Sequence, residues 1–70
     1  MTLKNRLRVA TTQEGRWVIF KDSPAGSIIR EEALKAFLDN ATTRKERSMV
    51  YDNAPSGSEV EKAALRTLYS

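Results

Sequence analysis

Five basic residues near the start of the chain are the side chains best suited to bind another molecule. They are Lys4, Arg6, Arg8, Arg16 and Lys21. Within residues 1–21 only Glu14 opposes them, so this segment holds more than the whole formal net charge of +3. Lys and Arg bind polyanions by neutralising phosphates and releasing their counterions. The charge distribution therefore indicates an anionic partner.

The composition argues against catalysis and against a bound metal. The 70 residues include no Cys and no His. These residues supply most ligands of zinc, copper and iron sites. Cys is also the strongest side-chain nucleophile, and His is the commonest general base near neutral pH. So short a chain also has little depth in which to desolvate a group and shift its pKa. We therefore expect no enzyme activity, no metal site and no cofactor.

The element that positions the five cations is predicted to be a β-hairpin. Over residues 3–11, apolar and basic residues alternate, as in a half-buried strand. The segment Gln-Glu-Gly at 13–15 is typical of a turn, and RWVIFK at 16–21 is rich in strand-forming residues. This prediction places Lys4, Arg6 and Arg8 on one face of the first strand.

The register of the hairpin decides which apolar residues share that face. A two-residue turn would place Trp17 and Ile19 beside the cations, whereas a three-residue loop with a bulged Gly15 would place Val18 and Phe20 there. The loop suits Gln-Glu-Gly better, because only Gly readily takes the positive φ that the bulge needs. Phe20 is therefore predicted to join the five cations in the binding face.

The rest of the chain is predicted to be helical. Ser27 is a predicted N-cap for a helix over 28–40, with an apolar stripe at Ile29, Ala33, Leu34, Phe37 and Leu38. Capping boxes at 43–46 and 58–61 predict a short helix to about residue 51 and a last helix to about residue 69. In this last helix Val60, Ala64, Leu65 and Leu68 are expected to face inward.

The expected fold is therefore α+β, with one domain over residues 1–70. An N-terminal antiparallel hairpin at 1–21 would pack against two or three short helices at 27–70. The words ALKAFL at 33–38 and ALRTLY at 64–69 resemble each other at an offset of 31 residues, but two such words are too few to predict a repeat protein.

Three further cations form a secondary candidate site. Arg44, Lys45 and Arg47 stand at a predicted helix start, where cations and backbone N–H groups can hold phosphates. Glu46 lies among them and weakens their field.

The predicted function is nucleic-acid binding, regulatory or architectural, by the basic ribbon, because two-stranded ribbons fit the major groove of DNA. The alternative is a small interaction module or inhibitor of phage or mobile-element type, which docks on a larger protein or nucleoprotein. The second predicted strand supports this alternative, because it is apolar on both faces. With no apolar run that could span a membrane, we expect a cytoplasmic protein without a membrane partner. Homodimerisation would add stability to so thin a core.

Overall fold

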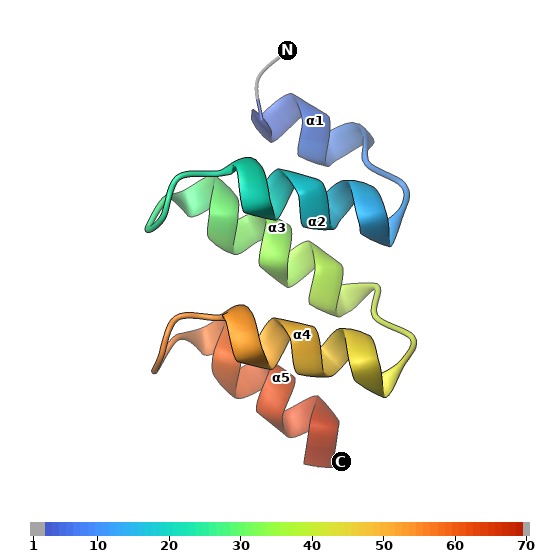
Figure 1. Cartoon of the computed structure of the whole chain (residues 1–70), viewed down its shortest axis with the longest axis vertical. Helices are drawn as coiled ribbons and strands as arrows, with labels where there is room; N and C mark the ends of the chain where they lie inside the picture. Colours follow the sequence, from blue (N-terminus) through green and yellow to red (C-terminus); the bar gives the residue numbers. More distant parts are fainter. Residues whose placement is uncertain (1–2, 70) are drawn as a thin grey trace.

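The computed structural model describes residues 3–69, which form a stack of five α-helices (Figure 1). In chain order they are α1 (Leu3–Val9), α2 (Gln13–Asp22), α3 (Ile28–Asp39), α4 (Arg44–Asn53) and α5 (Glu59–Tyr69). Helices α2 and α3 make one helical hairpin, and α4 and α5 make a second hairpin beside it. Helix α1 lies on the side of α2 and α3 that faces away from the second hairpin (Figure 1). The molecule is elongated, measuring 37 × 23 × 13 Å.

The predicted N-terminal β-hairpin, and with it the α+β fold class, is wrong, because residues 3–69 contain no strand. Leu7 and Ala10 are one helical turn apart, and both pack against the core. Val9, the residue that completes the apparent strand alternation, is 64% exposed. The spacing of Leu3, Leu7 and Ala10 follows the helical period, and only the interleaved cations imitate a period of two.

The predicted Gln-Glu-Gly turn is the first turn of α2. Thr12 is the N-cap, and its side-chain oxygen accepts a hydrogen bond from the N–H of Gly15 at 3.0 Å. Gly15 therefore has helical φ, not the positive value that a bulge requires. The following Trp-Val-Ile-Phe run is helical despite its strand preference, because Ile19 and Phe20 are buried in the core. Burial against α3 outweighs an intrinsic preference of a few tenths of a kcal/mol per residue.

The two helical hairpins are copies of one structural unit. Helix α2 begins at residue 13 and α4 at 44, while α3 begins at 28 and α5 at 59, an offset of 31 in both pairs. The connecting loops read PAGS at 24–27 and PSGS at 55–58, and their glycines Gly26 and Gly57 have φ of 79° and 81°. Left-handed backbone of this kind favours glycine. The segments that precede α2 and α4 also resemble each other at this offset. LKNRLRVATT at 3–12 matches LKAFLDNATT at 34–43. The architecture is therefore that of a helical repeat, although the two short words alone are too few to predict one.

The core runs through the two hairpins and the space between them. It consists of Ile19, Phe20, Ala33, Leu34, Phe37, Leu38, Val50, Val60 and Ala64. Four of the five predicted residues of the α3 stripe are buried. The prediction for α5 holds for Val60 and Ala64, but Leu65 is 38% exposed. The two hairpins thus bury corresponding residues to different extents.

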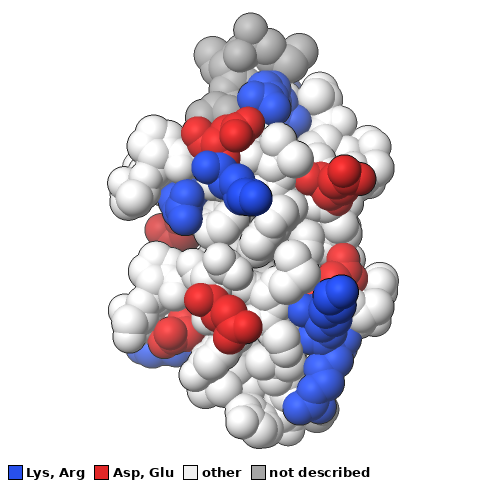
Figure 2. Space-filling model, in the orientation of Figure 1, with Lys and Arg blue, Asp and Glu red and all other residues white. Residues whose placement is uncertain are grey.

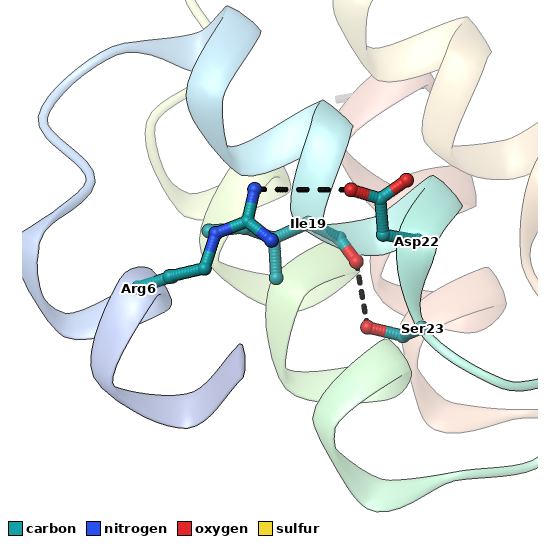
Figure 3. A network of polar contacts seen from close by, with 4 residues as sticks. All are labelled: Arg6, Ile19, Asp22 and Ser23. Carbon is teal, nitrogen blue, oxygen red and sulfur yellow. Dashed lines mark hydrogen bonds and ion pairs between the residues drawn. The ribbon is translucent and has the colours of Figure 1, made fainter. Parts of the chain in front are cut away.

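Polar contacts fasten α3 to the end of α2. The guanidinium of Arg30 donates hydrogen bonds to the carbonyl oxygens of Phe20 and Ser23, each at 3.1 Å, and lies 4.1 Å from the centroid of the Phe20 ring. The buried hydroxyl of Ser23 donates to the carbonyl of Ile19 at 2.6 Å, as Figure 3 shows. Carbonyls in the last turn of a helix have no intrahelical donor. Arg30 and Ser23 supply donors at this corner.

The three predicted N-caps are confirmed. Ser27, Thr43 and Ser58 each accept a hydrogen bond from the backbone N–H three residues later. In the second cap, a carboxylate oxygen of Glu46 also accepts from the N–H of Thr42 at 3.0 Å, and chiefly this bond lowers the pKa of Glu46. Because the folded-state pKa is lowered, this carboxylate stabilises the fold above its ordinary pKa. That contribution is lost as the pH falls through the lowered value.

Replacement of the α4 cap should measurably destabilise the protein. Thr43→Ala removes the oxygen that accepts from the Glu46 N–H, and we expect a loss of about 1 kcal/mol in the free energy of unfolding. Urea denaturation followed by circular dichroism measures this loss. Thr11→Ala, at an exposed position before α2, is the control and should change the free energy by less than about 0.5 kcal/mol. Equal losses in the two variants would contradict the role of the cap.

Candidate functional site

The cations of the predicted ribbon do not form one face. On a helix, residues two positions apart point in nearly opposite directions, so Arg6 and Arg8 of α1 diverge. Arg6 lies 3.7 Å from the carboxylate of Asp22 in α2, as Figure 3 shows, and Arg8 is exposed. The side chain of Lys4 lies outside the described part of the structure.

Of the other members of the predicted binding face, Arg16 and Phe20 contribute to the fold, and Lys21 lies apart from them. Arg16 is half-buried and donates to Gln13 Oε1 at 2.9 Å and to the Ala10 carbonyl at 3.5 Å, which ties α2 to the end of α1. Phe20 is only 2% exposed and belongs to the core, while Lys21 is exposed at the end of α2. In the upper half of Figure 2, acidic and basic groups are interspersed.

The secondary candidate residues do lie together. Arg44 and Lys45 are exposed and Arg47 is half-buried, all in the first turns of α4. Figure 2 shows a basic group over this part of α4. The positive end of the helix dipole adds to their field. The carboxylate of Glu46 lies in the same turn, and its negative charge reduces this field.

A groove lies between α3 and α5. Its cavity volume is about 740 Å³. Leu38, Val60 and Ala63 contribute apolar surface to its lining, and Ile28, which is 76% exposed, lies at the beginning of α3. The two helices run in the same direction, so the groove follows two parallel helices (Figure 1).

Charged residues of both helices line the groove in a definite order. They are Glu31, Glu32, Lys35 and Asp39 from α3, with Glu59, Lys62 and Arg66 from α5. Among the lining residues of each helix, the acidic ones come first and the basic ones follow, and only Asp39 departs from this order. The groove is therefore acidic where the helices begin and basic farther along. Such a surface complements a ligand that carries both signs of charge.

Reasoning from the sequence missed this groove, because it considered α5 separately from α3. The available signal was the 31-residue offset. It pairs Lys35 with Arg66 as equivalent positions of two stacked units. Charged residues that recur on one face of successive repeats are the pattern by which such a surface could have been found.

Comparison with protein-family models, with curated proteins and with solved structures finds no match for this chain. Within residues 3–69, no helix combines the length and the apolar character that crossing a membrane requires.

Proposed function

We propose that this chain is a non-enzymatic protein-interaction module whose α3–α5 groove holds an amphipathic helix of a partner protein. The observation that carries the proposal is the groove itself, which joins an apolar lining to an ordered set of charges. Amphipathic helices dock in this way, with the apolar stripe in a groove and the polar side chains at its edges.

The geometry of the groove supports a helical partner. Two parallel helices form a trough into which a third helix can settle at the usual interaxial distance of about 8–10 Å. The exposed Ile28 and the half-buried Ala63 would meet the apolar stripe of the incoming helix, above the buried Leu38 and Val60.

The charges support a protein partner over a nucleic acid. Basic residues of the partner helix would lie near Glu31 and Glu59, and acidic residues near Lys35 and Arg66. A uniform polyanion would meet repulsion at the acidic end of the groove. This is why the interaction module, the alternative of the sequence analysis, is the function favoured here.

Blocking the groove should weaken binding of a helical probe. The probe is a labelled amphipathic peptide of about 18 residues, with leucines on one face, lysines in its first third and glutamates in its last third. Ala63→Glu places a charged side chain in the half-buried lining, and we expect the dissociation constant to rise about tenfold or more, measured by fluorescence anisotropy. Val18→Glu is the matched control, because Val18 is exposed on α2 and does not line the groove.

A second variant guards against loss of folding. Glu31→Lys changes an exposed residue and should also weaken the probe, while a peptide with lysine replaced by glutamate at the facing end should regain affinity. Unchanged binding in both variants, or no binding to the unmodified protein, would contradict the proposal. A labelled DNA duplex provides the competing outcome. Tight, strongly salt-dependent binding that is lost on replacing Arg44, Lys45 and Arg47 by Ala would indicate a nucleic-acid partner instead.

A further inference from the structure

The side of α4–α5 that faces away from the first hairpin carries exposed apolar side chains. We call Leu65 and Tyr69 of α5 the end face, and these residues are 38% and 81% exposed. Leu68, in the same last turns of α5, is half-buried. Scattered exposed apolar residues are normal, but two large ones, one helical turn apart and with buried equivalents in the other repeat unit, are informative.

Each residue of the end face has a buried counterpart in the first hairpin. At the offset of 31 residues, Leu65 corresponds to Leu34 and Tyr69 to Leu38. The two counterparts are 1% and 8% exposed. Both positions carry a large apolar side chain in the two hairpins. The difference between the hairpins is therefore the presence of a cover.

The cover of the first hairpin is the second hairpin. Leu34 and Leu38 lie in α3, which packs on both α4 and α5. The residues that α4–α5 contributes to the shared core are Val50, Val60 and Ala64, all small and at most 4% exposed. Large residues of α3 and small residues of α4 and α5 thus share one core, as in layers that interdigitate closely.

From this equivalence we propose that the end face docks a further helical hairpin of the same repeat kind. That hairpin would present small apolar residues at the positions of Val50, Val60 and Ala64, and would bury the end face as α4–α5 buries its counterparts. Repeat arrays end in units with a polar outer face. Leu65 and Tyr69 occupy positions where such a cap would carry polar residues.

A second copy of the chain fits this face less well. Two end faces brought together would set Leu65 and Tyr69 against their own large counterparts, without small residues to receive them. The corresponding receiving surface of the first hairpin is occupied by α1, whose Leu7 and Ala10 pack on the core.

The test is an extended chain in which residues 40–69 are repeated directly after Ser70, so that the offset of 31 is preserved. If the added hairpin docks, the extended chain should unfold in one transition at a higher urea concentration than the original chain. Amide protons of α5 should exchange about tenfold more slowly or better, because the cover suppresses local opening.

One substitution made in both chains isolates the end face. Leu65→Glu should have a small effect on the original chain, because the side chain is partly exposed, and should lower the urea midpoint of the extended chain several times more. Arg66→Glu, at the neighbouring exposed position in the groove, is the matched control and should act equally in the two chains.

Three results would overturn the proposal. The first is unfolding of the added hairpin in a separate transition. The second is an equal effect of Leu65→Glu in both chains. The third is sedimentation of the original chain as a dimer that Leu65→Glu dissociates. The last result would show that a second copy covers the end face. None of these measurements involves the probe peptide, so they are independent of the proposed groove function.

Discussion

Leu34→Ala is expected to lower the free energy of unfolding by about 3 kcal/mol, whereas Leu65→Ala should lower it by less than about 1 kcal/mol. The two leucines occupy equivalent positions of the two hairpins, but Leu34 is 1% exposed and Leu65 is 38% exposed. Truncation of a fully buried leucine loses its transfer free energy and leaves a cavity. Truncation of Leu65 opens a site that water already reaches.

Urea denaturation of the two variants, followed by circular dichroism, measures both losses under the same conditions. A chain of this size is expected to have a stability of only a few kcal/mol, so the Leu34→Ala variant should be partly unfolded even without urea. A stabilising osmolyte such as trimethylamine N-oxide would then bring it into a measurable range. Equal losses at the two positions would contradict the unequal burial of the repeats.

The sequence was sufficient to predict the helices from Ile28 onward, because their signals are local. A side-chain oxygen at Ser27, Thr43 or Ser58 caps the helix through the backbone N–H three residues later, and each of these bonds is present. Such contacts depend only on neighbouring residues. The apolar stripe of α3 is likewise a property of one helix.

The N-terminal segment could not be predicted in the same way, because its helical state depends on distant residues. The run Trp17–Phe20 prefers a strand when it is considered alone. In the structure the Trp17 ring packs against the tilted rings of Phe20 and Phe37, with ring centroids 5.1 Å apart in both pairs. Phe37 belongs to α3, so the contact that fixes the helix appears only when the hairpin closes.

The candidate groove depends on the same kind of long-range information. Its lining combines α3 with α5, which are joined through α4 and two loops. The charge count did find the positive residues, but it could not place them. Arg6 and Arg8 point in different directions from one helix, and Arg16 donates hydrogen bonds to Gln13 and to the Ala10 carbonyl. The excess of positive charge in residues 1–21 therefore does not form one positively charged surface.

Arg30→Met is expected to lower the free energy of unfolding by about 2 kcal/mol. Methionine keeps much of the apolar stem of arginine but removes the two hydrogen bonds to the carbonyls of Phe20 and Ser23. It also removes the cation that lies 4.1 Å from the Phe20 ring centroid. Bonds from a charged donor contribute more than neutral ones, and the partial exposure of Arg30 keeps the expected loss below their sum.

Two further variants separate the parts of this contact. Arg30→Lys keeps the positive charge but cannot present two donors in the planar arrangement of a guanidinium, so it should recover less than half of the loss. A double-mutant cycle of Arg30→Met with Phe20→Leu isolates the interaction with the aromatic ring, for which we expect about 0.5–1 kcal/mol. Lys35→Met is the control, because Lys35 is an exposed cation on the same helix. If Lys35→Met lowered the free energy of unfolding as much as Arg30→Met, the loss would reflect the change in net charge. The contacts of Arg30 would then make no specific contribution to the packing of α3 on α2.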